Sequence, residues 1–438
     1  MNEGGPQKVY GATADEAGNI WVAGGEEGLF LLRPGATSFQ HFTLADGLRP
    51  YGYMPDGTTP PGPKYLKAIS VAGGPGGTVF VGYEGLPGSV SCEVNWDMPN
   101  PDPASYKSGD ADKVTLQEDG TLQVVHYDIF SGPGVVAAEP RGRERLCNIL
   151  RIAYDGRTHS VWFGGNHGFA RGDSTFEGNP ACNGQLSCSG LTEHVHPGLN
   201  AYVYSNRSED EQLYPNEPAR WRVKGALLTD AYYGVAVDPS GDAWFGGSDR
   251  STRFRYVSST GNMDAPNYWQ AQVMTEDKGY AWNRFDIWPD AVTEPVMSRP
   301  EQRTADTVSA IAVASDGTVW VGSFARGLAQ LAPDGTVLRR LSTELVDHRG
   351  LVSSVGADPL DGSIWAGASW GGGLSRVRGN TVAHYGTGVF GTDLSMSRIS
   401  DVQADRSGTR RRMLVSFMGY QLNATQWVAG TLGIYTGD

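Results

Sequence analysis

The amino-acid sequence predicts an all-β protein: a seven-bladed β-propeller with long loop insertions on one face. Three observations lead to this prediction. A short phrase returns along the chain with a period of several tens of residues, each copy alternates apolar residues with tight turns, and 60 glycines accompany only 19% charged residues. Repeats of this length cannot bury their own faces and therefore stack on their neighbours. Because the copies extend over nearly the whole chain, we expect one domain over residues 1–438.

In the repeated phrase a small or acidic run ends in Gly, an aromatic residue follows, and a Gly-rich corner comes next. The copies are ADEAGNIWVAGGEEGLF (14–30), GGTVFVGYEGL (76–86), SVWFGGNHGFAR (160–171), DPSGDAWFGGSDRS (238–251), SDGTVWVGSFARGLAQL (315–331), PLDGSIWAGASWGGGLSRV (359–377) and the degenerate ADRSGTRRRMLVSFMG (404–419). They predict blades over residues 8–47, 66–129, 148–196, 228–274, 307–343, 351–386 and 398–438. The fourth strand of the last blade stays unassigned.

The fifth copy shows how one repeat becomes a blade. Residues 308–314 alternate their side chains between two faces, as a strand does. Asp316-Gly317 makes a hairpin turn, because Gly takes a positive φ without steric cost. Residues 318–322, 328–331 and 336–341 then supply three more strands. Four antiparallel strands joined by tight turns form one propeller blade.

Six of the copies carry a large aromatic residue in the same slot. A flat ring at that place fills the wedge between neighbouring blades and buries a large area. We therefore assign these residues to the core and expect none of them to stack on a ligand: Trp21, Phe80, Trp162, Trp244, Trp320 and Trp365.

Charge and hydropathy exclude several function classes. The net charge of −13 argues against general affinity for nucleic acid or for an anionic membrane surface. No apolar run approaches the roughly 18 residues that a transmembrane helix needs. The first residues lack a basic stretch followed by an apolar one, so the chain as written predicts a cytosolic protein unless a signal peptide is missing.

The four cysteines point to an oxidising compartment instead. Cys182 and Cys188 lie in the loop-like segment CNGQLSC, and Cys92 and Cys147 lie in two other insertions. A zinc site is an alternative, but no common ligand spacing is present. We favour a Cys182–Cys188 disulfide, with Cys92–Cys147 as a second, over free thiols. Disulfides predict a secreted, periplasmic or cell-surface protein whose signal peptide is absent from this sequence.

A propeller usually binds its ligands on the face that carries the corners between second and third strands and the connections between blades. The corners of this chain present Glu26, Glu27, Tyr83, Glu84, Asn166, His167, Asp249, Arg250, Phe324, Arg326, Trp370, Phe417 and Met418. Ordinary hydrophilic decoration of exposed loops is the alternative interpretation.

Long connections favour the binding interpretation. Residues 48–65, 130–147, 196–229 and 275–306 join early blades, whereas the later connections are short. Long segments inside a compact domain are usually functional or disordered, and these are too aromatic for disorder. They contain Trp282 and Trp288, which we expect in a binding surface near blades one to four.

The phrase DGTVWVGSFARGL, preceded by VSAIAVA, resembles the two-component-regulator propeller repeat. The segments GLVSSVGADPLDGSIWAGASWGGGLSRV and FTLADGL are similar to that family as well. The resemblance implies a seven-bladed, periplasmic or extracellular sensor module of the kind that is joined to histidine kinases. Neither a kinase nor a transmembrane helix follows in this sequence.

A more distant similarity to streptogramin-lyase-type propellers implies a metal, an acid and a catalytic His above the central channel. The candidates on that model are His167 and Glu84 as catalytic residues, with Glu26, Glu84 and Asp249 as ligands of a divalent cation. The His-x-x-x-x-Glu-like context of those enzymes is not evident in this chain.

The sequence therefore favours an exported, non-enzymatic binding module without a cofactor, which holds a protein, peptide or glycan on the long-loop face of blades one to four. The alternative is a metal-dependent lyase that acts at the mouth of the channel. A third interpretation, a subunit of a cell-envelope assembly, requires a flat and apolar aromatic rim.

Overall fold

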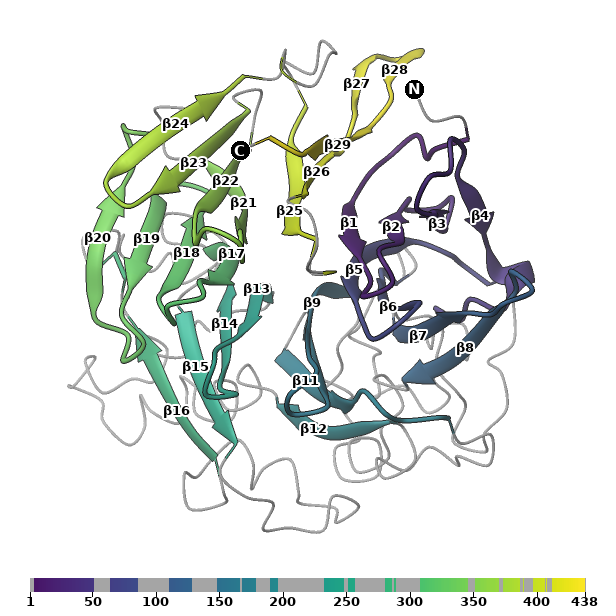
Figure 1. Ribbon diagram of the computed structural model, residues 1–438, viewed down its shortest axis with the longest axis horizontal. Coiled ribbons are helices and arrows are strands. Elements are labelled where there is room, and N and C mark those ends of the chain that lie inside the picture. Colours follow the sequence, from purple (N-terminus) through teal and green to yellow (C-terminus); the bar gives the residue numbers. More distant parts are fainter. Residues whose placement is uncertain are drawn as a thin grey trace, which may run out of the picture.

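Sheets of antiparallel strands follow one another around a ring (Figure 1). The computed structural model describes residues 4–50, 64–85, 110–127, 148–165, 168–178, 190–195, 232–247, 251–256, 280–285, 287–288, 308–345, 351–369, 373–386, 389, 397–405, 407 and 412–437. Within the described part of the chain, the helical structure is a single short 3₁₀ turn, η1 (Leu44–Asp46). The prediction of an all-β propeller is confirmed.

Six of the sheets have four strands each, in chain order. They are β1 (Gly11–Ala14), β2 (Ile20–Ala23), β3 (Leu29–Leu32), β4 (Gln40–Phe42); β5 (Ala68–Gly73), β6 (Thr78–Tyr83), β7 (Ala111–Leu116), β8 (Leu122–Tyr127); β9 (Ile149–Asp155), β10 (Ser160–Gly165), β11 (Gly168–Asp173), β12 (Leu191–Val195); β13 (Tyr232–Val237), β14 (Ala243–Gly247), β15 (Ser251–Tyr256), β16 (Tyr280–Phe285); β17 (Val308–Val313), β18 (Val319–Ser323), β19 (Gly327–Leu331), β20 (Val337–Leu341); and β21 (Val352–Ala357), β22 (Ile364–Ala368), β23 (Leu374–Arg378), β24 (Thr381–Tyr385).

The seventh repeat differs from the prediction of seven complete blades. It forms a three-stranded sheet of β25 (Ile399–Ala404), β26 (Met413–Phe417) and β29 (Thr431–Tyr435). The residues between β26 and β29 pair with each other as a hairpin, β27 (Tyr420–Asn423) and β28 (Gln426–Val428), instead of adding to the sheet. Among the described residues, the count of four-stranded blades is therefore six. For brevity, we refer to the sheets as blades one to seven in chain order.

The first strands of the blades surround the ring axis, and each contacts the first strand of the next blade. Strand β25 contacts both β21 and β1, which joins the end of the ring to its beginning. A serine repeats at this junction. The hydroxyl groups of Ser309 and Ser353 donate to the backbone carbonyl that begins the next blade, and Ser400 donates in the same way to Val9 at 2.7 Å. The seventh repeat thus closes on the first by the same bond that joins blade five to blade six and blade six to blade seven.

An aspartate explains why the repeated phrase places an aromatic residue after an acidic turn. Asp15 accepts hydrogen bonds from the Asn19 backbone at 3.0 Å and from the Trp21 indole Nε1 at 2.8 Å. Asp238 binds the Trp244 indole in the same way at 2.9 Å. One carboxylate therefore caps the turn and fixes the ring that packs between blades.

The recurring aromatic residues form the core, as predicted. All six are at most 4% exposed: Trp21, Phe80, Trp162, Trp244, Trp320 and Trp365. Arginines cover three of the rings, with Arg339 over Trp320 and Arg376 over Trp365 at 5.0 Å, and Arg171 over Trp162 at 5.6 Å. These indoles serve packing and cation–π contacts within the protein.

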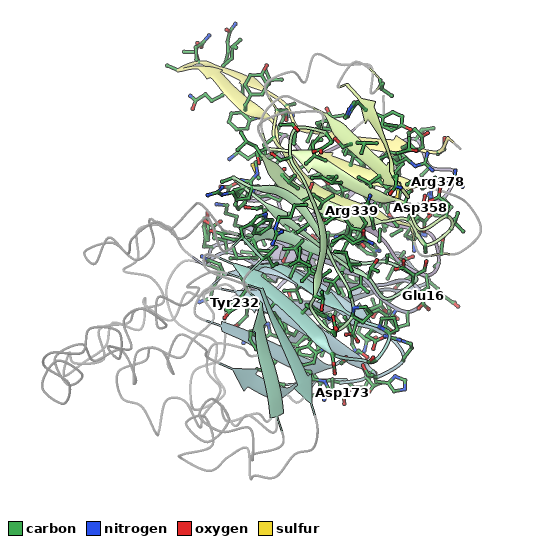
Figure 2. The ribbon with its side chains drawn as sticks, turned by 90° about the vertical axis from the view of Figure 1, so that its left-hand side faces the viewer. Glu16, Asp173, Tyr232, Arg339, Asp358 and Arg378 are labelled. Carbon is green, nitrogen blue, oxygen red and sulfur yellow. The ribbon has the colours of Figure 1, made fainter. Side chains whose placement is uncertain are left out.

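The ring has two faces, which we name by their connections. The corner face carries the turns from second to third strands and the connections between blades, and the turn face carries the remaining turns. In the side view of Figure 2, Tyr232 at the start of β13 lies toward one face, and Glu16, Asp358 and Arg378 lie toward the other. No helix in the described part of the chain is long and apolar enough to cross a membrane.

Candidate functional site at the corner face

The structure places several of the predicted corner residues at the surface of the corner face. Glu26 is exposed, and four others are partly exposed: Glu27, Glu84, Phe324 and Arg326. Five lie outside the described residues: Asn166, His167, Asp249, Arg250 and Trp370. The same holds for Cys92, Cys147, Cys182 and Cys188, and for the side chain of Trp282 in β16. These positions remain predictions.

Three predicted rim residues are buried, which corrects their assignment to the surface. Trp288 is 4% exposed and packs with Trp244 and the apolar side chains of blade five. Phe417 is completely buried beside Trp365. Tyr83 is completely buried as well, and its hydroxyl donates to Asp112 Oδ2 at 2.6 Å. Their aromatic rings fill the interior, because removing apolar surface from water stabilises the fold.

Tyr83 belongs to a buried ionic network in blade two. The two ring nitrogens of His126 face Asp112 Oδ1 at 2.9 Å and Asp110 Oδ2 at 3.1 Å, and all three side chains are at most 3% exposed. Burial lowers the pKa of His126, but the hydrogen bonds and charges of Asp110 and Asp112 outweigh it and raise that pKa to about 9. The imidazole is therefore a cation at neutral pH, and this network links the second, third and fourth strands of the blade.

Glu26 and Glu84 do come together, as the sequence predicted, but around a lysine. Lys67 Nζ lies 2.7 Å from Glu84 Oε1 and 4.0 Å from Glu26 Oε1, and Lys8 Nζ lies 3.4 Å from Glu26 Oε2. Lys67 also lies over the ring of Tyr10, 5.6 Å from its centroid. Burial, helped by the charges of both glutamates, raises the pKa of Tyr10 to about 12.

This lysine has a consequence for the metal site that the lyase interpretation requires. An ammonium group already occupies the place between the two carboxylates, and a divalent cation at that place would have to displace it. Among the described residues, no group of three metal-ligating side chains converges. The other two members of the predicted constellation, His167 and Asp249, lie outside the described residues.

An ion pair crosses the ring axis. Arg151 on β9 contacts Asp401 on β25 at 2.5 Å, although 250 residues separate them, and its Nε donates to the Tyr233 carbonyl at 3.1 Å. Gln403 adds a second crossing: its amide donates to Asp401 at 2.7 Å and to the Val71 carbonyl at 3.0 Å. Polar side chains therefore tie blades two, three, four and seven together across the axis.

A second arginine lies next to this pair, where β25 begins. The Arg398 guanidinium lies over the ring of Phe324, 5.3 Å from its centroid, and Phe324 in turn makes an edge contact with Tyr233 at 5.7 Å. Burial, helped by the nearby charge of Arg151, lowers the pKa of Arg398. Its Nε is buried and has no hydrogen-bond partner. We call Arg151, Tyr233, Phe324, Arg398 and Asp401 the axial cluster.

Sequence reasoning identified Phe324 but missed the charged members of the axial cluster. The signal was present in the repeat. Strand pairing places one residue of each first strand at the same position, and five blades have a small residue there: Gly11, Ser70, Gly234, Ala310 and Ser354. The other two blades have Arg151 and Asp401. Opposite charges at one position of two repeats predict a pair across the axis.

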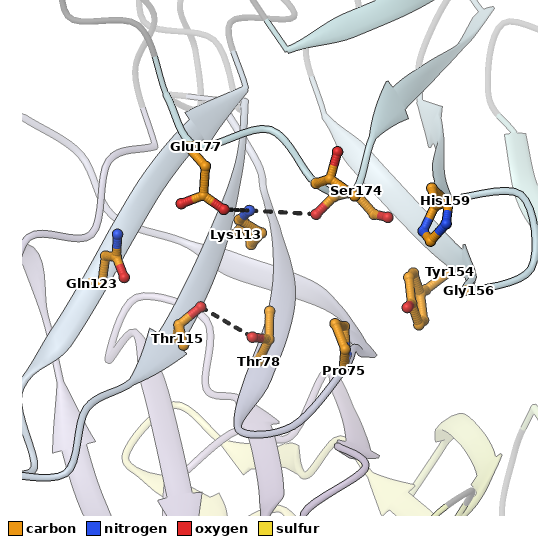
Figure 3. A pocket seen from close by; sticks show the side chains of 11 residues that line it. Pro75, Thr78, Lys113, Thr115, Gln123, Tyr154, Gly156, His159, Ser174 and Glu177 are labelled. Carbon is orange, nitrogen blue, oxygen red and sulfur yellow. Dashed lines mark hydrogen bonds and ion pairs between the residues drawn. The ribbon is translucent and has the colours of Figure 1, made fainter.

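The turn face carries a cavity of about 480 Å³ between blades two and three (Figure 3). Lys113 on β7 lies in it, and its ammonium donates to the Ser174 carbonyl at 3.3 Å and lies 3.7 Å from Glu177. In the same wall, the hydroxyl groups of Thr78 and Thr115 form a hydrogen bond with each other at 3.0 Å. Lys113 therefore links blade two to blade three across this cavity.

Comparison with known proteins identifies the fold. The WD40 repeats of RRP9 superimpose with a TM-score of 0.52 at 9% identity, over 99% of this chain and 96% of that one. A chain from the mitotic checkpoint complex gives a TM-score of 0.51 at 9% identity, over 100% and 93% of the two chains. The extracellular domain of a putative hybrid two-component system from B. thetaiotaomicron gives 0.51 at 12% identity, over 98% of this chain and 40% of that one.

These identities are low, so the similarity shows the β-propeller fold alone. No protein-family model matches the sequence. No curated protein sequence matches it. The resemblance to the two-component-regulator repeat therefore rests on the sequence pattern, and the described residues form six four-stranded blades and a three-stranded seventh sheet. Because one fold hosts many unrelated functions, the propeller by itself assigns no role to this chain.

Proposed function

We propose that this protein is a non-enzymatic binding module that holds a protein or peptide partner on its corner face, around the axial cluster. The observation that carries the proposal is the axial cluster itself. Arg398 and Phe324 present a cation and an aromatic ring where several blades converge, and the Arg151–Asp401 pair lies beside them on the ring axis. Arginine and aromatic residues are the side chains that dominate binding energies at protein interfaces.

Selection of displayed peptides tests this proposal. Peptides enriched on the immobilised protein should bind with a Kd that rises at least about tenfold, or ~1.4 kcal/mol, when Phe324→Ala removes the ring from the corner face. The matched control is Arg378→Met on the turn face, where Arg378 is 69% exposed and lies 3.7 Å from Asp361. Equal affinities of the two variants would refute the corner face as the binding site. Binding to a glycan array when no peptide is selected would refute a protein or peptide partner.

The lyase alternative has a direct test as well. If the module binds no catalytic metal, the melting temperature should stay constant when a chelator is added and when Mn²⁺ or Zn²⁺ is titrated. A chelator-sensitive melting temperature that becomes insensitive in Glu84→Gln would instead support a metal at the predicted site.

Export is part of the proposal and rests on the cysteines. In an oxidising compartment we expect Cys182–Cys188 and Cys92–Cys147 to be disulfides. Protein that is unfolded without reductant should then show few reactive thiols. Four reactive thiols per chain in material prepared from an oxidising compartment would refute both bonds.

A further inference from the structure

The corners of blades two and seven have the same backbone and different charges. In blade two the backbone N–H of Glu84 donates to the carbonyl of Lys67 at 2.9 Å, and in blade seven the N–H of Met418 donates to the carbonyl of Arg398 at 3.0 Å. The strand registers agree, since Ser70 pairs with Gly82 and Asp401 pairs with Ser416. Arg398 therefore occupies the position of Lys67, and Met418 occupies that of Glu84.

The substitution removes a counter-charge from the corner of blade seven. The side chain of Lys67 reaches the carboxylate of Glu84 at 2.7 Å. Met418 offers a thioether instead, which is at best a weak acceptor. Across the part of the chain that the structure describes, no side chain or carbonyl accepts a hydrogen bond from the Arg398 guanidinium, and its Nε is buried. Asp401, three residues along the chain, is bound to Arg151 and Gln403.

Arg398 is only partly exposed, so a guanidinium at this place without a counter-ion is costly, and the neighbouring charge of Arg151 adds to the cost. Phe324 covers one side of the guanidinium and compensates in part. An incoming anion would supply the missing charge and accept hydrogen bonds in the planar geometry that guanidinium groups favour. The chain as a whole carries a net charge of −13, so an anion is attracted here by the local cluster and not by the overall field.

We propose that Arg398 is the receptor for a carboxylate group of the bound partner, and that Phe324 and Tyr233 form the aromatic wall beside it. A carboxylate fits because its two oxygens can accept two parallel hydrogen bonds from one guanidinium. In the equivalent corner of blade two, the carboxylate of Glu84 is the counter-ion of Lys67. That this carboxylate belongs to a protein or peptide partner rests on the proposed binding function.

Small probes test the receptor directly. N-acetylglycine carries the carboxylate of a peptide C-terminus, and N-acetylglycinamide is its neutral match. N-acetyl-glutamic acid α-amide carries a side-chain carboxylate. Binding is followed by ligand-observed NMR at constant low ionic strength, because salt screens exposed charges. We expect both carboxylates to bind at least about tenfold tighter than the amide. A preference between them tells whether the partner offers its C-terminus or an acidic side chain.

Two variants connect the binding to the corner. Arg398→Met removes the cation, and Met418→Glu places in blade seven the carboxylate that blade two has. Each should reduce carboxylate binding to the level of the amide, whereas Arg378→Met on the turn face should leave it unchanged. Circular dichroism and melting temperature check the fold, and Met418→Glu should melt no lower than the wild type, since it supplies a counter-ion.

The outcomes separate this inference from the proposed function. Carboxylate binding that survives in Arg398→Met and Met418→Glu would overturn the receptor, and so would Arg398-dependent binding of inorganic phosphate without binding of the carboxylates. If selected peptides lose affinity in Phe324→Ala but keep it in Arg398→Met, the binding function stands and the receptor is wrong. If N-acetylglycine binding depends on Arg398 while no peptide is selected, the receptor stands and the peptide-binding function is wrong.

Discussion

Blades two and seven share one backbone plan and differ in where they place their charges. Blade two pairs its corner lysine with glutamates and buries an ionic network of Asp110, Asp112 and His126. Blade seven places Met418 at the corner and directs its one axial carboxylate, Asp401, across the ring to Arg151. The ionic partners of blade two thus lie within that blade, whereas the axial carboxylate of blade seven pairs with another blade. The difference teaches that repeats can keep one backbone plan while the charges at equivalent corners differ.

The largest effect on stability should come from removing the cation of the buried network in blade two. His126→Leu leaves Asp110 and Asp112 buried without the cation between them, and removal of one partner from a buried ionic network costs about 3–5 kcal/mol. We expect the free energy of unfolding, from urea titration at pH 6.5, to fall by about that amount. A loss below ~1 kcal/mol would show that the ion pairs of His126 contribute little to the stability of the fold.

The pH dependence of stability should identify the same network. The pKa of His126 is raised from 6.5 in the unfolded chain to about 9 in the folded one, so the folded state holds its proton more tightly. The stabilisation is fully present below pH 6.5 and is lost as the pH rises through 9. This difference corresponds to about 3 kcal/mol. The stability gap between wild type and His126→Leu should therefore narrow from pH 6.5 to pH 9.5; a constant gap would contradict a charged His126.

Asp401 gives the corresponding test for blade seven. Replacing it by Ser, the residue that blade two has at this position, leaves Arg151 without its carboxylate. Arg151 is 18% exposed, so we expect a loss of about 2 kcal/mol in unfolding free energy, less than for a fully buried pair. Because Arg151 would then act on the Arg398 site without its counter-ion, N-acetylglycine should bind several-fold tighter. Unchanged stability together with unchanged binding would separate Asp401 from the axial cluster.

The sequence predicted the propeller because its strongest signals are local and repeated. An aspartate, a turn glycine and a buried tryptophan lie within six residues of each other, as in Asp238 and Trp244, and their geometry follows from one hairpin. The surface assignments failed where a residue looked like part of a loop. Trp288 lies in a long connection by sequence, yet it packs beside Trp244, and no local pattern distinguishes an exposed loop aromatic from a buried one.

The axial cluster depends on contacts between residues far apart in the chain. Arg151 and Asp401 are separated by 250 residues, so periodicity within one repeat does not reveal them. Alignment of the first strands does, because it shows opposite charges where other blades have small residues. The pairing of Lys67 with Glu84 was equally hidden. Sequence reasoning took Glu84 as a corner residue of the binding face, or as a metal ligand in the lyase alternative, and did not consider the residue before β5.

The smallest effect should come from making the corner of blade two resemble that of blade seven. Glu84→Met removes the nearest carboxylate from Lys67, but Glu26 remains at 4.0 Å. Because Glu84 is 29% exposed, the unfolding free energy should fall by about 1 kcal/mol or less. Only when Glu26→Gln is added should Lys67 lose both counter-charges and bind N-acetylglycine, more weakly than Arg398 does, because a lysine lacks the planar pair of donors. Glu84→Met alone could instead bind the probe as tightly as the Arg398 corner does. Any cation without a counter-ion on this face would then suffice, and the aromatic wall of Phe324 and Tyr233 would contribute nothing to binding.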